Sequence, residues 1–468
     1  MGSDGRIPES RRSRFSRRSE TSELTYSSRF DPTTDMEFPT RDDVDGLLDP
    51  QPLPPFARVA YEPPTETVTN PRQRLRSELA TLPLEELERG ATVALGVGSR
   101  GIHDLAAYVT EAVSALRDRD LEPVIVPAMG SHGGATAEGQ RDLLAALDVT
   151  EERIGAPIDA RMDVEEVGEV TVGETTVPAY VSTAALEADG VVVLNRVKPH
   201  TNFTGRIESG LVKMAVVGLG KQAGANAFHS TAIAEGYVPT LEALLSVVRE
   251  ALPLLGGIAL VENFYEETAH VEGVPADAFE EREPDLLERA REEMATLPHD
   301  DLDLLVVDEI GKEISGAGMD TNVIGRYEVL NAPEPERPDV DLIYVRGLTA
   351  HTKGNGNGIG LADLTRRSAV EQLDLQQTYA NALTSGSLAK ARLPVVAPDD
   401  ELAVRIACSA LGGYDPDEVR IAWIENTTDL EELYVSEALL EELTDDVAVL
   451  EHGRLSFDDG AMTFAAEE

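Results

Sequence analysis

The chain has 468 residues, and its 86 acidic against 40 basic side chains give a formal net charge of −46. This charge repels nucleic acid and anionic membranes, so we expect neither as a partner. The acidic residues are spread along the whole chain, which indicates a surface adapted to high salt, as in an extreme halophile.

The single cysteine, Cys408, excludes an internal disulfide and any cysteine-built metal site. It lies in an apolar helical pattern, so we predict a buried structural thiol.

The N-terminal residues contain a basic stretch, RRSRFSRR, without the apolar core of a signal peptide. We therefore interpret residues 1–45 as a disordered tail or as a misassigned start upstream of Met36. No run of the chain approaches the roughly 18 apolar residues of a membrane span, so we expect a cytoplasmic protein.

Residues 46–297 alternate between strand and helix patterns. We expect a strand at 91–99, a helix at 104–119, a strand at 122–129, a helix at 136–149 and, after a hairpin at 167–181, a buried strand at 188–197. This order predicts a parallel sheet covered by helices, in an N-terminal α/β domain that binds the cofactor and carries catalysis.

A polar, highly charged helix at 280–301 is the expected connector to a C-terminal α/β domain, residues 298–468. Its expected strands and helix are 301–310, 340–348, 391–398, 401–413 and 419–426. The predicted fold is therefore α/β, with two α/β domains and mainly parallel sheets.

Polar loops follow several of these strands, and in open α/β sheets ligands bind beyond the carboxyl ends of the strands. The loops carry Arg100, His132 and His200 in the first domain and Lys312 in the second. Because both domains contribute such loops, we predict an active site in the interdomain cleft.

Lysine is rare in this chain. Three of its six lysines, Lys198, Lys213 and Lys221, lie within 24 residues, together with His200. Lysine supplies a compact ammonium and, once deprotonated, a nucleophile, and arginine supplies neither. We therefore expect amine chemistry in this segment, with a plain surface lysine as the alternative at each position.

The histidines suggest proton transfer. His132 lies among glycines and Ser131, where an imidazole is accessible, and His200 follows the rigid Pro199. The sequence lacks H-x-H, H-E-x-x-H and G-x-S-x-G, which argues against a zinc hydrolase and a serine hydrolase. The remaining chemistry is proton transfer by paired histidines, with a lysine as a covalent or charged anchor.

From about residue 50 onward these motifs resemble the nickel-pincer-nucleotide-dependent lactate racemase family. GSHGGAT is similar to its Gly-x-His loop, PHTNFTG to its Pro-His-x-Phe-x-Gly stretch and SGLVK to its Ser-Gly-x-x-Lys. The resemblance implies that His132 and His200 are the catalytic acid/base pair and that Lys213 is joined covalently to the cofactor. It also implies that His229, 16 residues after Lys213, coordinates nickel.

The implied cofactor is a pyridinium-3-thioamide-5-thiocarboxylate mononucleotide that holds Ni, which makes cofactor-biosynthesis enzymes candidate partners. By the same resemblance, Ser209 and Gly210 belong to the cofactor-binding segment, Arg100 binds the substrate carboxylate, and Lys312 is the best candidate for a further substrate contact. Val97 stands where the family has an aspartate. Such departures favour a 2-hydroxy acid other than lactate.

The implied activity is that of an isomerase, a racemase or epimerase that inverts C2 of a small-molecule 2-hydroxy acid. It acts by transient hydride transfer to the cofactor, with two histidines as acid and base. One alternative is a sugar-acid or dicarboxylic-acid epimerase of the same family, which cations beyond Arg100 would favour. The others are a non-catalytic nickel- or cofactor-binding protein and an unrelated metal hydrolase.

Overall fold

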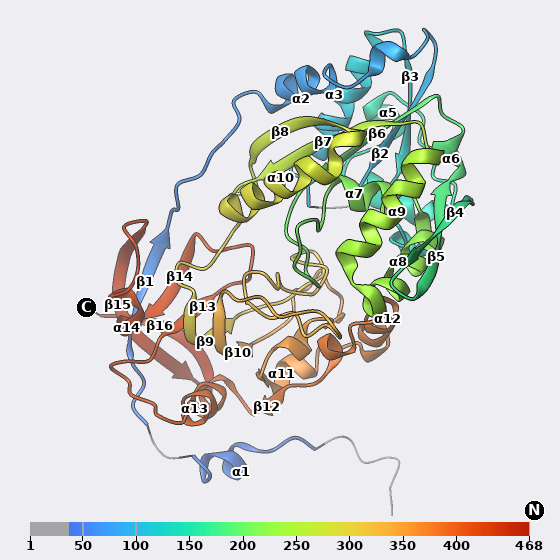
Figure 1. The fold of residues 1–468 in the computed structure, drawn as a ribbon. Coiled ribbons are helices and arrows are strands. Elements are labelled where there is room, and N and C mark those ends of the chain that lie inside the picture. Colours follow the sequence, from blue (N-terminus) through green and yellow to red (C-terminus); the bar gives the residue numbers. More distant parts are fainter. Residues whose placement is uncertain (1–36, 49–50, 99–100, 468) are drawn as a thin grey trace, which may run out of the picture. The chain divides into compact units, whose positions relative to one another are not determined.

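The computed structural model describes residues 37–48, 51–98 and 101–467. Residues Pro39–Glu468 form one compact unit, to which all elements below belong (Figure 1). Most of the expected N-terminal tail lies outside the described residues. Its last part, Arg41–Asp45, forms the short helix α1, which Thr40 caps.

The first sheet has five strands in the order β3-β2-β6-β7-β8. Its strands are β2 (Thr92–Val97), β3 (Glu122–Pro127), β6 (Gly190–Arg196), β7 (Leu254–Glu262) and β8 (Thr268–Pro275). The first four are mutually parallel, and β8 is antiparallel to β7.

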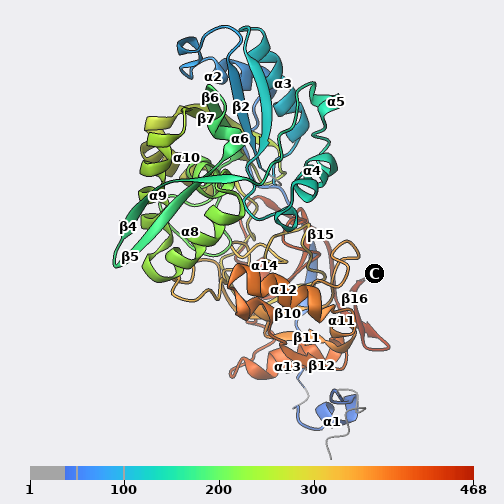
Figure 2. The same cartoon turned by 90° about the vertical axis from the view of Figure 1, so that its right-hand side faces the viewer.

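Helices cover both faces of this sheet (Figures 1 and 2). Along β6, Val191 and Val193 enter one core, and Val192 and Leu194 enter the other. A strand buried on both faces has apolar residues at every position, as the sequence at 188–197 indicated. The helices are α2 (Pro71–Leu79), α3 (Leu105–Arg117), α4 (Ala137–Ala146), α5 (Glu151–Ile154), α6 (Thr183–Leu186), α7 (Leu211–Lys213), α8 (Lys221–Glu235), α9 (Tyr237–Ala251) and α10 (Phe279–Glu293).

We call the part of the chain from β2 to α10 the first half. The expected alternation of strands and helices in this half is confirmed. The predicted hairpin is also present, as β4 (Val164–Val172) paired antiparallel with β5 (Thr175–Ser182). Gly173 takes the left-handed backbone conformation at its turn, with φ of +56°.

The second sheet has nine strands in the order β12-β11-β10-β9-β13-β14-β1-β15-β16. The parallel part consists of β9 (Asp301–Val307), β10 (Asp339–Val345), β11 (Leu364–Arg366), β12 (Val395–Ala397) and β13 (Ile421–Ile424). The antiparallel part consists of β14 (Glu432–Ser436), β1 (Pro55–Tyr61), β15 (Val447–Asp458) and β16 (Ala461–Ala466). Its helices are α11 (Arg367–Val370), α12 (Leu375–Ser385), α13 (Asp400–Ala410) and α14 (Glu437–Leu440).

The fold is therefore α/β with two mixed, largely parallel sheets. The sequence patterns did not reveal the antiparallel part of the second sheet. In particular, β1 precedes the whole first sheet in the chain, yet it pairs with β14 and β15. Strand partners far apart in sequence are chosen by tertiary packing, and local periodicity does not record them.

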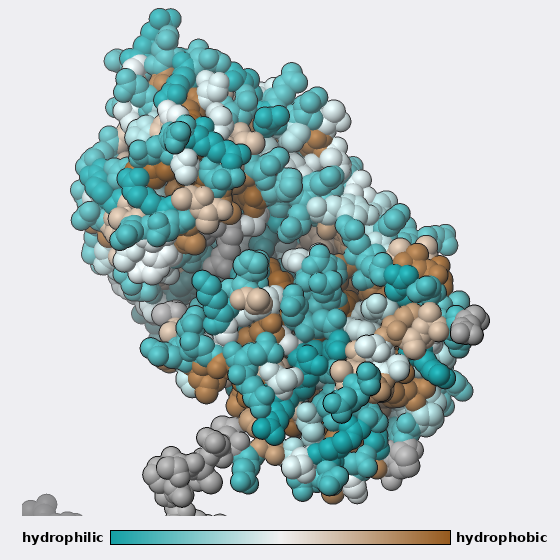
Figure 3. All heavy atoms as spheres, turned by 180° about the vertical axis from the view of Figure 1, so that it is seen from behind, coloured by the Kyte–Doolittle hydropathy of each residue, from teal (hydrophilic) through white to brown (hydrophobic). Residues whose placement is uncertain are grey.

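Cys408 is buried as predicted, and no helix in the described part of the chain has the length and apolar character that a membrane span requires. Hydrophilic residues cover most of the face drawn in Figure 3, with hydrophobic residues in smaller patches among them.

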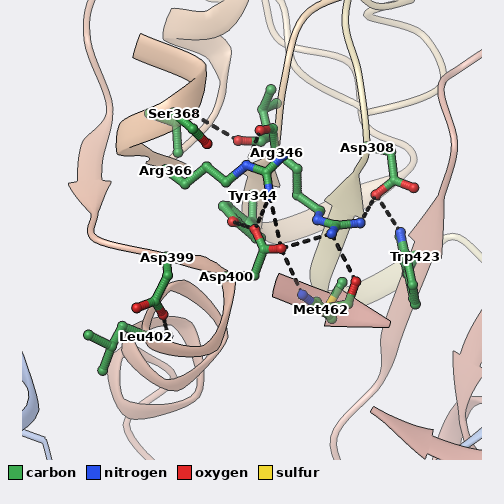
Figure 4. Close-up of polar contacts among 12 residues, drawn as sticks. Asp308, Tyr344, Arg346, Arg366, Ser368, Asp399, Asp400, Leu402, Trp423 and Met462 are labelled. Atoms are coloured by element: carbon green, nitrogen blue, oxygen red, sulfur yellow. Dashed lines mark hydrogen bonds and ion pairs between the residues drawn. The ribbon is translucent and has the colours of Figure 1, made fainter. Parts of the chain in front are cut away.

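We call the part of the chain from β9 to β16 the second half. The buried carboxylate of Asp400, at the start of α13, joins several of its segments by hydrogen bonds (Figure 4). It accepts hydrogen bonds from the Tyr344 hydroxyl (2.5 Å), Arg346 (2.8 Å), Arg366 (2.9 Å) and the Met462 N–H (2.8 Å). Burial alone would raise the pKa of Asp400, but the bonds from Arg346 and Met462 outweigh it and lower the pKa.

Replacing Asp400 by Asn should lower the free energy of unfolding by about 3 kcal/mol, because it removes the buried charge that Arg346 and Arg366 share and leaves Arg346 with Asp308 alone. Denaturant unfolding measures the change. The exposed Asp417→Asn serves as control and should stay within about 0.5 kcal/mol of the wild type. Equal unfolding midpoints for the two variants would contradict the role of Asp400.

Candidate active site

A pocket opens at the carboxyl ends of β2, β3 and β6, with about 830 Å³ of empty space, part of it open to solvent. Its lining includes His132, Lys198, Ser209, Lys213 and His229. All described residues that line it lie between Gly98 and His229, so the first half builds this pocket.

The segment 198–213 folds back on itself. The Lys198 N–H donates to the Ser209 carbonyl (2.9 Å), and the Ser209 N–H donates to the Lys198 carbonyl (3.3 Å). This closure brings Lys198 and Lys213 to one pocket, although the loop with His200 lies between them. Lys198 also lies beside the loop after β2, because a β-carbon placed on Gly101 would be 3.9 Å from its Nζ.

Lys213 ends the short helix α7 and is followed by a π-helical turn, Met214–Gly218. Such turns are rare and often mark functional sites. The N-terminal side of α7 packs against Glu283 of α10, whose buried carboxylate accepts the Val212 N–H (2.9 Å). A β-carbon on Gly210 would lie 2.5 Å from that carboxyl group. Gly210, predicted in the cofactor segment, is thus required at least for this close packing.

His200 is buried, and its Nδ1 accepts the backbone N–H of Asn202 (3.0 Å). This bond assigns the proton of the neutral ring to Nε2. Burial and then the charge of Lys213 hold the pKa of His200 well below its usual value. The pKa is low because the fold removes the ring from water and places cations near it.

His229 projects from α8 into the pocket lining. Burial, followed by Lys213, lowers its pKa to about 4, which keeps the ring neutral as a metal ligand must be. Among the described residues, no group of three or more His, Cys, Asp or Glu side chains could hold a metal ion. A metal at His229 would therefore need further ligands from a bound molecule.

Aromatic rings connect the buried His200 with the half-buried His229. His200 lies 4.5 Å from Phe203 between ring centroids, and Phe203 stacks on Tyr237 at 4.3 Å. Tyr237 lies 6.1 Å from Phe228, whose ring is 5.1 Å from His229. The packed rings restrict the orientation of both imidazoles.

His132 is exposed and lines the same pocket. Gln140 supports its loop, because the Gln140 side-chain amide donates to the Gly130 carbonyl (2.9 Å). Lys221 donates in turn to the Gln140 side-chain oxygen (3.1 Å) and to the Pro127 carbonyl (2.7 Å). Lys221 is fully buried, and burial lowers its pKa to about 8. Its amine therefore supports the loop and does not line the pocket.

The pocket tests neither of the two predicted substrate contacts. Arg100 lies outside the described residues. Lys312 does not line the pocket, and its Nζ donates to the Gly316 carbonyl (2.5 Å). The proposed role of each remains a prediction.

Sequence reasoning missed two carboxylates that shape the segment 198–213. The buried Glu208 accepts the N–H groups of His200 (2.5 Å) and Gly205 (2.8 Å) and pairs with Arg291 of α10 (2.6 Å). The second is Glu283, which lies on the buried face of α10 with Phe279, at helical spacing. The sequence signal that could have identified Glu283 is a carboxylate on an otherwise apolar helix face.

The fold and the pocket together define an α/β protein with a ligand site at the carboxyl edge of its five-stranded sheet. No family model matches the chain, and no curated protein matches it. Among solved structures, it is similar to the lactate racemase apoprotein from Thermoanaerobacterium thermosaccharolyticum. The identity is 14%, the TM-score is 0.49, and the similarity covers 80% of this chain and 99% of that chain.

Burial raises the pKa of Glu283 to about 7, well above the roughly 4.3 of an unfolded chain. Between these two values the folded state binds more protons, so the stability that this group contributes falls as pH rises. Relative to Glu283→Gln, the wild type should lose about 1.4 kcal/mol of unfolding free energy per pH unit in this window. Denaturant unfolding at several pH values measures the difference, and one that does not vary with pH would contradict it.

Proposed function

We propose that this chain is an isomerase that racemises or epimerises C2 of a 2-hydroxy acid, with a nickel-pincer nucleotide attached covalently to Lys213. The observation that carries the proposal is the pocket itself, where Lys213, His229 and His132 line one cavity at the strand ends. The resemblance of the motifs around these residues to the lactate racemase family supports the same activity.

The residues present fit this cofactor. The Lys213 amine can form an amide-type bond, which a guanidinium cannot, and the neutral His229 ring can bind nickel while the nucleotide supplies the remaining ligands. Lys198 is suited to an anionic group of the ligand. When bound, the cofactor supplies the hydride acceptor.

The histidines would handle the proton of the substrate hydroxyl. His200 does not line the pocket in the described part of the chain, and its lowered pKa leaves the ring neutral, which is the form that can accept this proton. A bound anion near Lys213 and Lys198 would offset their positive charges and raise the pKa of His200 toward neutrality. The accessible His132 would act as the partner group from the other side of the substrate.

Lys198 favours one substrate class within this proposal. Its side chain lines the pocket, so it would supply a cation in addition to Arg100, which lies outside the described residues and is proposed to bind the C1 carboxylate. A 2-hydroxy acid with a second carboxylate would use both charges, whereas lactate would use one. We therefore place dicarboxylic 2-hydroxy acids first among candidate substrates, with sugar acids next.

Coexpression of the chain with cofactor-making enzymes tests the attachment. We expect a nucleotide-sized mass increase that maps to Lys213 and about one nickel per chain. The Lys213→Ala variant should carry neither, while Lys353→Ala, a change at an exposed lysine, should carry both. An adduct on another lysine, or an unmodified chain, would overturn the proposal.

Chiral chromatography with a panel of 2-hydroxy acids then tests catalysis. The variants His132→Gln and His200→Gln should each lower turnover by about 10²–10⁴-fold, since each removes a general acid/base. Both should keep the adduct and the nickel. A non-catalytic cofactor-binding protein would give a different result. The loaded wild type would convert no member of the panel, and the two variants would behave in the same way.

A further inference from the structure

The second half of the chain holds the turn that follows His200. Lys390, in the short 3₁₀ helix Leu388–Ala391, donates from Nζ to the Asn202 side-chain oxygen (2.6 Å) and to the Thr201 carbonyl (3.0 Å). The Thr321 hydroxyl donates to the same Thr201 carbonyl (3.0 Å). Two segments of the second half thus meet at one turn of the first.

Asn202 connects this contact to the imidazole. Its side chain accepts from Lys390, and its backbone N–H donates to Nδ1 of His200 (3.0 Å). Asn322, also from the second half, donates from its side-chain amide to the His200 carbonyl (3.4 Å). The orientation of the Asn202 peptide, and with it the hydrogen bond to the ring, therefore depends on groups of the second half.

Lys390 is not an ordinary surface lysine. Its side chain is 2% exposed, and burial lowers its pKa to about 8, against the opposing charges of Asp320 and Glu334. A buried amine is costly unless its donors are used, and Lys390 donates to two acceptors in the turn after His200. The chain has only six lysines, so a buried lysine at the His200 turn indicates a specific role for its amine.

We propose that Lys390 is a positioning residue for His200: it fixes the 200–202 turn, so that Nδ1 accepts the Asn202 N–H and the proton stays on Nε2. The catalytic consequence rests on the proposed function, because only an enzyme that uses His200 needs this tautomer. The structural consequence does not rest on it. Lys390 itself does not line the pocket, so it would act on turnover and leave substrate binding largely unchanged.

The test uses the full chain with ¹⁵N-labelled histidine, and His200→Gln assigns the His200 signals. In the wild type, the ring nitrogen shifts of His200 should report the Nε2–H tautomer alone. In Lys390→Met, which keeps the apolar stem and removes the donor, a substantial Nδ1–H population should appear. Lys353→Met removes an exposed lysine and should leave the His200 shifts as in the wild type.

Asn202→Ala provides a second variant, because it removes one of the two acceptors of Lys390, the Asn202 side-chain oxygen, and keeps the backbone N–H. It should produce the same tautomer mixture, and circular dichroism establishes that each variant is folded. If Lys390→Met does not fold, Asn202→Ala decides the question. Unchanged tautomers in a folded variant would overturn the proposal.

Activity separates this inference from the proposed function. In the cofactor-loaded enzyme, Lys390→Met should lower kcat by about 10²-fold, with KM changed by less than about threefold, because it misplaces a reacting group. A wild-type enzyme without racemase activity would refute the proposed function and leave the tautomer result standing. A tautomer change with full kcat would refute the catalytic part of the inference.

Discussion

The site depends on how the chain closes the segment between β6 and α8. Lys198 and Ser209 join its backbone, and two buried carboxylates, Glu208 and Glu283, accept N–H groups along it. Both carboxylates are held by α10, Glu283 because it belongs to that helix and Glu208 through Arg291. Because buried carboxylates are costly unless they accept several hydrogen bonds, each favours one conformation of the loop over others. Lys213 enters the pocket as a result.

The electrostatics of the pocket depend on a few cations in an otherwise acidic chain. The chain carries a formal net charge of −46, yet lysines lie at the pocket and around His200. In high salt the surface charges are screened within a few ångströms, whereas partly buried cations keep their influence on nearby groups. A small anionic ligand is thus attracted by the pocket, although the chain as a whole would repel it. Burial and, after it, the charge of Lys213 lower the pKa of the neutral His200 ring before a ligand binds.

Local sequence patterns predicted the elements that pack by periodicity, such as the buried strand at Gly190–Arg196 and the hairpin around Gly173. The motifs and their family resemblance also identified His132, Lys213 and His229 as candidate site residues, and these three line one pocket. Contacts across long sequence separations were not predictable. β1 joins the second sheet, and Lys390, which no sequence pattern singled out, contacts the His200 turn. No periodicity records which lysine of one half meets a loop of the other.

The most direct measurement of the central claim is anomalous X-ray diffraction at the nickel edge, from crystals of the cofactor-loaded chain. We expect one strong peak within coordination distance of a His229 ring nitrogen, about 2.0–2.1 Å for an imidazole–metal bond. We also expect electron density that is continuous from that peak to Nζ of Lys213. Nickel bound only to surface carboxylates, with an unmodified Lys213 side chain, would contradict it.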